Sequence, residues 1–449
     1  MSVIPQSIAY KESGIPWVGK IPEHWEVRKI KQVARIVTGK TPSEKSNQDW
    51  GNDLMFITPT DCLVGKKYVS SSARKLSQEG IKNFASIIVP KDSVLVSCIA
   101  SIGKVAVNSE NTLTNQQINT VVPNKNLSST DFLYYQLLTA MPFVEKYFCG
   151  YSTLPIINKG DFSNLPIVFP SLQEQQTIAD FLDKKTQQIE DFIDKKQKLI
   201  TLLEEKKQTL INQCVTQGLD PSIPLEDSGV EWLGQIPTHW EVKKLKLLFN
   251  IGSGLGITKA DFVPSGIPCV SYGEIHSKYP CRLDTKIHPL PYVSEDYLSS
   301  KPQALLKKGD FVFADTSEDI EGSGNFTSLQ SDESVFAGYH TITLKPKTQK
   351  IHSPYFSFLF DSLGVRNQIR KEVCGVKVYS VTKSILKEVQ CLIPPLEEQK
   401  AIAEYLDTQI TKIDLAISKI KSQINLIKEY KTTLISEAVC GRVGIGEKV

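Results

Sequence analysis

The sequence predicts an α+β fold in which two β-rich α/β modules alternate with two long helices that pair as an antiparallel coiled coil. Three observations predict it: a tryptophan-rich segment occurs twice, a helix-opening segment occurs twice, and the stretches between them differ. The chain is therefore an internal repeat with pseudo-two-fold symmetry. The predicted boundaries are a module at 1–170, a helix at 171–221, a module at 222–394, and a helix with a tail at 395–449.

The tryptophan-rich segment opens each half. Residues 14–27 read Gly-Ile-Pro-Trp-Val-Gly-Lys-Ile-Pro-Glu-His-Trp-Glu-Val, and residues 229–242 read Gly-Val-Glu-Trp-Leu-Gly-Gln-Ile-Pro-Thr-His-Trp-Glu-Val. The two copies hold four of the five tryptophans. His24 and His239 lie in the repeated Pro-x-His-Trp turns. We expect both histidines to have a packing or turn role.

The helix-opening segment follows each module. Residues 172–183 read Leu-Gln-Glu-Gln-Gln-Thr-Ile-Ala-Asp-Phe-Leu-Asp, and residues 396–407 read Leu-Glu-Glu-Gln-Lys-Ala-Ile-Ala-Glu-Tyr-Leu-Asp. Ser171 and Glu174 have the spacing of a capping box, which predicts a helix from Ser171 to Thr216. The second helix is predicted from Leu396 to Cys440, but proline replaces the capping serine, which leaves its start in doubt.

Apolar residues recur with heptad spacing along both predicted helices, which is typical of a coiled coil. Each helix would be about 65–70 Å long, too long to lie along one module, so the two helices can bury their stripes against each other. The same stripes are candidate interfaces with partner proteins. The candidate interface residues are Leu182, Ile189, Ile193, Leu203, Leu210, Leu406, Ile413, Ile417, Ile420, Ile427 and Leu434.

Short β-rich runs bounded by Gly, Pro, Asn and Asp fill the modules. A Cys-Gly pair survives in both, at 149–150 and 374–375. Strands are predicted at 86–90, 93–99, 103–108 and 119–122 in the first module and at 309–315 and 340–345 in the second.

Composition narrows the class. A chain of 449 residues with 41% apolar residues can form two to four domains. Residues 1–160 hold 18 Lys and Arg residues against 12 Asp and Glu residues, a mild preference for an anionic partner. The nine cysteines form no CxxC pair and no Cys/His ligand spacing. With no signal-peptide core and no apolar run of about 20 residues, a soluble cytoplasmic protein with incidental thiols is expected.

Catalytic motifs are not legible. Gly39-Lys40-Thr41 resembles the end of a phosphate loop, but the glycine required five positions earlier is Ala34. The glycines at 252, 254 and 256 lack dinucleotide-binding spacing. No methyltransferase Asn/Asp-Pro-Pro-aromatic motif and no nuclease motif is present. We therefore expect no active site, no bound cofactor and no metal site on this chain.

The two repeated segments, in this order and each present twice, resemble the specificity (S) subunit of type I restriction–modification systems. The resemblance covers essentially the whole chain. It implies two target recognition domains, each reading one half of a split double-stranded DNA site, separated by two helices that pair antiparallel. It also implies that catalysis belongs to partners: two modification subunits that use S-adenosylmethionine for DNA methylation, and restriction subunits that use ATP and Mg²⁺.

The target is predicted to be two unrelated short sequences separated by unread base pairs, because the frame repeats while its contents differ. Basic and polar loop residues are the candidate DNA contacts, and amides can pair with adenine. In the first module they are Lys40, Thr41, Ser43, Lys66, Lys67, Arg74, Lys75, Lys104, Asn115, Gln116 and Gln117. In the second module they are Lys259, Tyr272, His276, His340, Lys377 and Tyr379.

Two other classes of function remain open. A self-contained DNA methyltransferase with its own target domain would bind S-adenosylmethionine as an isolated chain. A coiled-coil scaffold would lack sequence-dependent DNA affinity. The recognised sequence and the spacer length depend on loop geometry that the sequence does not reveal.

Overall fold

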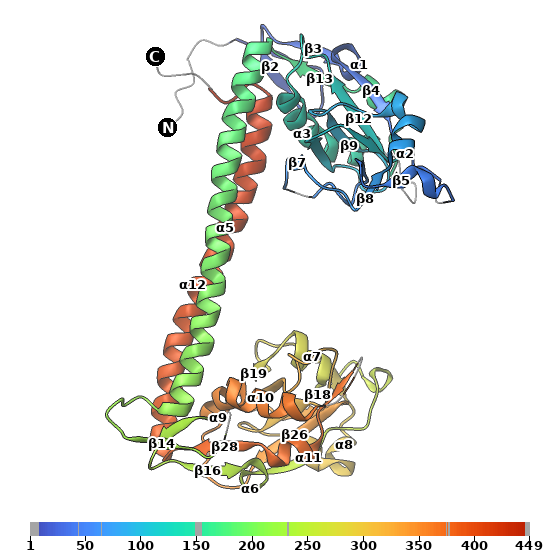
Figure 1. The fold of residues 1–449 in the computed structure, drawn as a ribbon. Helices are drawn as coiled ribbons and strands as arrows, with labels where there is room; N and C mark the ends of the chain where they lie inside the picture. The colour runs from blue at the N-terminus through green and yellow to red at the C-terminus, as the bar shows by residue number, and fades with distance from the viewer. Residues whose placement is uncertain are drawn as a thin grey trace. The chain divides into compact units, whose positions relative to one another are not determined.

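The computed structural model describes residues 9–43, 45–63, 65–148, 155–230, 233–373, 375 and 378–444. The chain forms two compact units (Figure 1). Unit 1 comprises Met1–Lys196 and Lys421–Val449, and unit 2 comprises Gln197–Ile420. Each unit therefore contains one β-rich module and part of both long helices.

The two long helices are confirmed to within one residue at either end. They are α5 (Leu172–Gln217) and α12 (Leu396–Val439). At the start of α5, Ser171 and Glu174 form the predicted capping box: the Ser171 N–H donates to Glu174 Oε2 (3.1 Å), and Ser171 Oγ accepts from the Glu174 N–H (3.3 Å). α12 begins at the equivalent residue without this hydroxyl, so the missing cap does not move the helix start.

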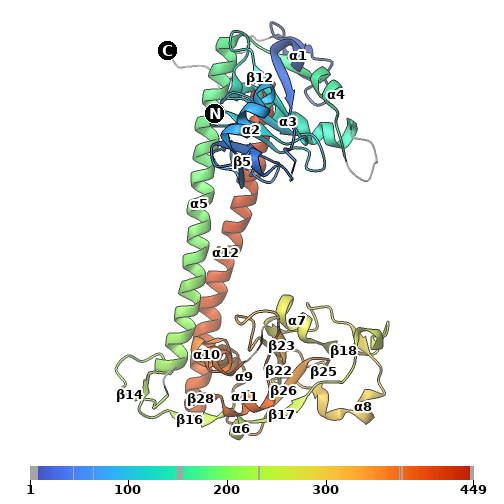
Figure 2. The same ribbon diagram turned by 45° about the vertical axis from the view of Figure 1, so that its right-hand side comes forward.

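Within each unit the two helices lie side by side (Figure 2). Glu190 of α5 forms an ion pair with Lys431 of α12 in unit 1, and Lys207 pairs with Asp414 at 2.8 Å in unit 2. Higher residue numbers on α5 meet lower ones on α12, so the predicted antiparallel pairing is confirmed.

The heptad stripes are covered by the chain's own helices and modules. Leu182 and Ile189 belong to the core of unit 1 together with Leu434, and Leu406 belongs to the core of unit 2. Ile193, Ile427 and Leu210 pack on these cores, Leu203 is half-buried, and Ile413, Ile417 and Ile420 are buried. These residues are not free to bind partner subunits, so any partner must contact other positions on the helices.

Each module contains a five-stranded sheet and a four-stranded sheet, and the five-stranded sheets have the same strand order in both units. In unit 1 the five-stranded order is β4 (Ala34–Thr38), β12 (Ile118–Pro123), β9 (Val94–Ser97), β10 (Val105–Asn108) and β7 (Tyr68–Val69). In unit 2 it is β17 (Phe249–Ser253), β26 (Thr341–Pro346), β22 (Phe311–Ala314), β24 (Phe326–Leu329) and β19 (Cys281–Leu283). Only the last pair of each sheet is parallel.

The four-stranded sheets differ in strand order: their parallel pair lies at one edge of the sheet in unit 1 and in its centre in unit 2. Unit 1 has β11 (Thr112–Thr114), β6 (Leu54–Ile57), β8 (Arg74–Leu76) and β5 (Trp50–Gly51). Unit 2 has β20 (Tyr292–Val293), β18 (Ile267–Val270), β25 (Val335–Ala337) and β21 (Leu305–Leu306). The pairs β6–β11 and β18–β25 are parallel in both.

Alternation along the central strands divides each module into layers. Val94 and Val96 of β9 face the core that contains α3 (Thr130–Phe148), whereas Leu95 faces the other side of the sheet, with Met55 of β6. In unit 2 the place of α3 is taken by α9 (Ser353–Asp361) and α10 (Leu363–Glu372). Figure 1 shows these helices beside their sheets.

The remaining elements complete the frame. Two-stranded pairs are β1 (Tyr10–Glu12) with β2 (Lys20–Pro22), β3 (Glu26–Lys29) with β13 (Pro166–Phe169), β14 (Leu225–Asp227) with β15 (Gln235–Pro237), β16 (Glu241–Lys244) with β28 (Gln390–Ile393), and β23 (Thr316–Ser317) with β27 (Tyr379–Ser380). Short helices are α1 (Ile30–Val33), α2 (Gln78–Asn83), α4 (Lys159–Asn164), α6 (Leu245–Leu248), α7 (Tyr272–Ser277), α8 (Tyr297–Ser300) and α11 (Lys383–Glu388). The 3₁₀ turns are η1 (Asn47–Asp49), η2 (Ala85–Ile87), η3 (Lys259–Asp261) and η4 (Pro302–Ala304).

One predicted strand is wrong. Residues 86–90 begin in the turn η2, and only Val89 makes a bridge, to Thr112. The N–H groups of Ile87 and Ile88 both donate to the Phe84 carbonyl, so the backbone closes locally instead of pairing with a strand. Pro90 then has no N–H with which to extend the pairing. The other five predicted runs overlap the strands β9, β10, β12, β22 and β26, and β12 and β26 extend beyond the predicted ends.

Thiols outside any disulfide occur among the described residues at 62, 214, 269, 281, 391 and 440, and burial raises the pKa of Cys62 to about 12. The Cys-Gly match at 149–150 and its copy Cys374 lie outside the described residues. Among the described helices, none has the length and apolarity to cross a bilayer.

Candidate nucleic-acid interface

The two repeated segments meet in both units through one glutamate. In unit 1, Glu174 Oε1 accepts from Trp25 Nε1 (3.1 Å) and lies 2.7 Å from His24 Nε2. Burial alone would raise the pKa of the Glu174 carboxyl, but hydrogen bonds from His24, Ser171 and Trp25 outweigh it and hold the pKa below its usual value. His24 is 59% exposed, so of the two roles expected for it, the structure supports the one in the turn, where it bonds Glu174. Trp17 adds to the same core, whereas its copy Trp232 lies outside the described residues.

The same contact recurs in unit 2. Glu398 Oε2 accepts from Trp240 Nε1 (3.1 Å) and lies 2.8 Å from His239 Nε2. We call each His–Trp–Glu group the motif clasp. It joins the tryptophan-rich segment to the first turn of the long helix that follows the module.

The glutamine after each clasp glutamate holds the module's loop against the helix start. Gln175 is almost fully buried; its Nε2 donates to the carbonyls of Pro170 (2.9 Å) and Leu127 (3.1 Å), and its Oε1 accepts from the Ser129 N–H (2.9 Å). Gln399 is fully buried and makes three matching bonds, to the carbonyls of Pro394 (2.9 Å) and Lys350 (3.2 Å) and from the His352 N–H (3.0 Å). Each module is therefore held at a defined place on its helix.

The aspartate that ends each helix-opening segment binds a basic side chain from the edge of the five-stranded sheet. Lys67, just before β7, has its Nζ within 2.7 Å of both Asp183 oxygens and 2.7 Å from Asp131. Arg282 of β19 pairs with Asp407 in unit 2. Burial alone would lower the pKa of Lys67, but the two carboxylates raise it above its usual value.

This arrangement corrects the expectation for Lys67. Its side chain is only 14% exposed and its charge is neutralised by two carboxylates, so it is a docking residue and not a phosphate contact. Lys104 is also half-buried, and its Nζ donates to the Pro59 carbonyl at 2.7 Å. Sequence reasoning missed the docking role, although the repeated aspartates at 183 and 407 were visible signals.

A short turn precedes the strand next to the sheet edge in each module. We call residues 115–117 in unit 1 and 338–340 in unit 2 the entry turns. They are equivalent because the carbonyl of Gln117 accepts from the residue after β9 (Cys98 N–H, 2.8 Å), and the carbonyl of His340 accepts from the residue after β22 (Asp315 N–H, 3.1 Å). The strand register agrees, since Ile118 pairs with Ser97 and Thr341 with Ala314.

The entry turn of unit 1 gathers several of the candidate contacts. Thr41 Oγ1 donates to Gln116 Oε1 (2.6 Å), and Gln116 is exposed. Asn115 is buried and bonds Gln117, so it supports the turn from behind. Lys40 is exposed, and its N–H donates to the Thr114 carbonyl beside the turn.

The other candidates of unit 1 are exposed but not gathered at this turn. Arg74 lies over the Trp50 ring, 3.5 Å from its centroid, and neighbours Lys75 in β8. Ser43 and Lys66 are exposed in loops. No hydrogen bond within the described residues joins these four to the entry turn.

In unit 2 the structure brings three candidates to one cleft of about 700 Å³. Tyr272 and His276 come from α7, and His340 comes from the entry turn. Sequence reasoning missed its other polar walls, Thr316 and Asp319, which carry no recognisable motif. Lys259 is exposed in η3 and Tyr379 is half-buried in β27, and neither lines this cleft; Lys377 lies outside the described residues.

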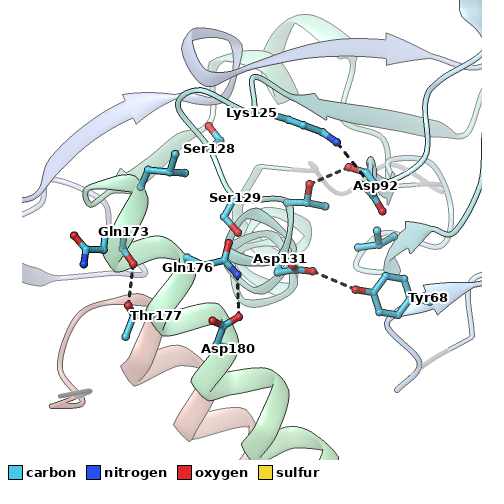
Figure 3. Close-up of a pocket in the computed structure, with 13 residues that line it drawn as sticks. Tyr68, Asp92, Lys125, Ser128, Ser129, Asp131, Gln173, Gln176, Thr177 and Asp180 are labelled. Atoms are coloured by element: carbon cyan, nitrogen blue, oxygen red, sulfur yellow. Dashed lines mark hydrogen bonds and ion pairs between the residues drawn. The ribbon is translucent and has the colours of Figure 1, made fainter. Parts of the chain in front are cut away.

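A second, larger cleft of about 850 Å³ lies in unit 1 between the module and the start of α5 (Figure 3). Its polar groups bond one another: Gln176 Nε2 donates to Asp180 (2.8 Å), and the Tyr68 hydroxyl donates to Asp131 (3.4 Å). None of the candidate DNA contacts lines it. This cleft is a feature of module docking and not of the candidate interface.

The chain matches a protein family described as "Type I restriction modification DNA specificity domain" twice, over residues 22–202 and 237–426. It is 25% identical over 455 residues to the type I restriction enzyme MjaIX specificity subunit of Methanocaldococcus jannaschii, covering 98% of this chain and 97% of that protein. It is 33% identical over 156 residues to the HindI specificity subunit of Haemophilus influenzae, covering 34% of this chain and 33% of that protein.

Solved structures share the fold. A chain described under "Structural basis underlying complex assembly and conformational transition of the type I R-M system" matches with a TM-score of 0.72 at 15% identity, covering 94% of this chain and 99% of that one. The HsdS subunit of Thermoanaerobacter tengcongensis matches with a TM-score of 0.55 at 15% identity, covering 94% and 98%. With both halves of the sequence matched and the repeated motifs joined in both units, this chain belongs to the family of type I restriction–modification DNA specificity subunits.

Proposed function

We propose that this chain reads a split, asymmetric site in double-stranded DNA, one half with each unit. The observation that carries the proposal is the contrast between frame and contents. The motif clasp, the buried glutamine and the docking aspartate recur in both units. The entry turns hold Asn-Gln-Gln in one unit and Gly-Tyr-His in the other.

The physical argument follows from what each part does. The motif clasp, the buried glutamine and the docking aspartate fix each module to its own helix. Because these contacts recur in both units, each entry turn has the same position relative to that helix. Different side chains at the same position hydrogen-bond different base edges in the major groove. Two equal frames with unequal side chains therefore suit two unrelated half-sites, whereas identical halves would suit a palindrome.

The catalytic steps are proposed to belong to partner subunits in the cytoplasm. Two modification subunits would use S-adenosylmethionine for methyl transfer, and restriction subunits would use ATP and Mg²⁺. The family membership of the chain supports this division of labour. The purified chain, supplied with DNA and all three cofactors, should neither methylate nor cleave. Turnover by this chain alone, or binding of S-adenosylmethionine to it, would favour the self-contained methyltransferase instead.

Apolar side chains on the outer faces of the helices suit the binding of these partners. In unit 1, Phe192, Leu426 and Tyr430 are 39%, 65% and 54% exposed. Their heptad positions flank the buried stripe on one side of the helix pair. In unit 2, Leu199 and Leu202 of α5 and Leu415 of α12 are exposed on the helices. Exposed aromatic residues such as Phe192 and Tyr430 are enriched at protein-binding surfaces.

A module exchange tests the proposal. Residues 30–165 would be replaced by those of a relative with another target, and methylated sites would be mapped genome-wide in cells that carry the modification subunits. We expect one half-site to change and the other to stay. The reciprocal exchange of residues 245–390 is the matched control and should change only the other half. A chimera whose whole target changed would contradict readout by separate units.

A further inference from the structure

The entry turn of unit 1 fixes which atom of Gln117 is available to a ligand. Asn115 Oδ1 accepts from the backbone N–H of Gln117 (3.1 Å), which sets the orientation of the Asn115 amide. Its Nδ2 therefore donates to Gln117 Oε1 (2.8 Å). The carbonyl end of Gln117 is occupied within the turn, and its Nε2 is the group left to face a ligand. Gln117 presents a hydrogen-bond donor.

The entry turn of unit 2 fixes the opposite polarity at His340. Thr316 donates its hydroxyl to Asp315 Oδ1 (2.5 Å). His340 Nδ1 lies 3.1 Å from the same carboxylate oxygen and 3.2 Å from Thr316 Oγ1, and both of these atoms can accept. An ionised carboxylate only accepts, so Nδ1 carries the ring proton in the neutral imidazole. His340 Nε2 is then a hydrogen-bond acceptor.

The setting of His340 indicates a functional position. Its φ angle is +56°, in the left-handed region that a side chain rarely adopts. The side chain is nevertheless 58% exposed, so no buried packing requires a large residue there. Strain of this kind persists where the surrounding structure holds it, and the carboxylate of Asp315 supplies that hold.

The other histidine of the cleft, His276, has no ring nitrogen available to a ligand. Arg366 Nη1 donates to Asn325 Oδ1 (2.9 Å), so Asn325 Nδ2 faces His276 Nδ1 (2.9 Å) and donates to it. His276 Nε2 therefore carries the proton and donates to the Thr316 carbonyl (2.8 Å). Both nitrogens of His276 are used within the protein. His340 Nε2 is thus the ring nitrogen of the two histidines that remains for a ligand.

From these two networks we propose that Gln117 and His340 are specificity-determining residues that read base edges of opposite polarity. Gln117 donates to a major-groove acceptor, such as guanine O6 or N7, in the first half-site. His340 accepts from an exocyclic amine, adenine N6 or cytosine N4, in the second half-site. The inference rests on the proposed function, because it assigns to each entry turn one base of the half-site that its unit reads.

A DNA base suits His340 better than a basic segment of a partner protein. The residue occupies the same backbone position as Gln117, whose unit carries the exposed Lys40 and the half-buried Thr41 beside the turn. The rings of Tyr272 and Tyr339 lie 5.5 and 6.1 Å from that of His340, each inclined at 78° to it, so two aromatic rings flank the acceptor edge to face. Aromatic rings beside one fixed acceptor favour an aromatic ligand with one donor.

Removal of single exocyclic amines from the mapped site tests the proposal. Duplexes would carry purine in place of one adenine, or 2-pyrimidinone in place of one cytosine, and bind the full chain assembled with its modification subunits. We expect one position in the second half-site to lose about five- to 150-fold in affinity, the equivalent of one good base contact. The complex with His340→Ala should bind duplexes with and without the amine at that position equally well and should still respond to changes at the other positions. Gln117→Glu should weaken binding to the first half-site only.

Control variants separate folding from readout. His340→Gly accepts the positive φ without strain and must match the thermal stability of the parent chain, while it loses the same sensitivity as His340→Ala. Insensitivity of the parent complex to every amine of the second half-site would overturn the inference. So would a His340 variant that keeps its half-site but weakens assembly with the modification subunits, which would make the cleft a protein contact. If either result were found while recognition of a split site still required this chain, only the inference would fail and the proposed function would stand. If recognition of a split site did not require this chain, both the inference and the proposed function would fail.

Discussion

Units 1 and 2 are built alike where a module meets a helix and differ where a module faces its ligand. The clasp glutamates accept the same tryptophan and histidine at the same distances to within 0.1 Å. The entry turns keep their backbone hydrogen bonds but exchange amides for a tyrosine and a histidine. The repeated motifs therefore fix each module to its helix. They hold the entry turns in a constant position, so the side chains of a turn can differ without a change in the contacts between module and helix.

The largest effect in this comparison is expected from the buried glutamines. Gln175→Ala and Gln399→Ala each remove three hydrogen bonds to backbone groups, of which two are buried in unit 1 and one in unit 2; each buried group left without a partner costs about 1–3 kcal/mol. Each change should loosen its own unit and abolish recognition of one half-site. Hydrogen exchange of the two units and methylation mapping measure the two effects. Gln173→Ala, at an exposed neighbouring position, is the control and should change neither. If one of these substitutions lowered amide protection equally in both units, the two units would not be stabilised independently.

The docking ion pairs should differ between the units because their burial differs. Lys67 is 14% exposed and holds two carboxylates, whereas Arg282 is 40% exposed. We expect Lys67→Ala to lower the free energy of unfolding of unit 1 by about 2 kcal/mol, since two half-buried carboxylates lose the cation that they share. Arg282→Ala should cost about 1 kcal/mol or less in unit 2. Denaturant dependence of hydrogen exchange in each unit measures both. A larger effect from the arginine would mean that exposure does not govern these contacts.

The helices should set the gap between the half-sites while the modules set their sequences. The register that pairs Glu190 with Lys431 and Lys207 with Asp414 is kept when four residues are added to each helix, after Lys198 and after Ser422. Four residues lengthen a helix by about 6 Å and are tolerated in coiled coils as a stutter. Each base pair spans about 3.4 Å, so the unread spacer should grow by about two base pairs.

The position of this insertion matters. An insertion near the end of α5 would displace Cys214 and Val215, which are buried in the core of unit 2. Methylation mapping of the variant with insertions in both helices gives the spacer directly. An unchanged spacer, with both half-sites still recognised, would mean that another part of the complex sets the distance.

The smallest effect is expected from exposed lysines that contact phosphates. Lys40→Ala and Lys66→Ala should each weaken binding about equally for all sequences and reduce the slope of log affinity against log salt by about one. Lys67→Ala is the informative comparison, because its charge is already neutralised within unit 1 and its removal should leave the salt slope unchanged. Titrations at several salt concentrations measure the slope. A salt slope that falls for Lys67→Ala but not for Lys40→Ala would show that DNA does not bind at the surface that carries Lys40.

Much of the frame was predictable because its signals are local or periodic. The helix-opening segments and heptad rows predicted both helices to within one residue, and β-rich runs bounded by turn residues located most of the predicted strands. The exception at 86–90 shows the limit: apolar content alone does not distinguish a strand from a turn that closes on Phe84. The second helix shows the converse, since it begins at the expected residue without the expected cap.

Repeated residues at fixed spacing are sufficient to predict the duplication, the two long helices and the family. Which side chains are available to a ligand depends instead on tertiary contacts. Lys67 and Lys104 look like any loop lysines until their partners, Asp183 and the Pro59 carbonyl, are brought to them from 116 and 45 residues away. Likewise, Gln117 and His340 have no sequence feature in common, and only strand pairing places them at the same position in their modules. Contacts between distant residues are set by packing, and no local pattern in the chain records them.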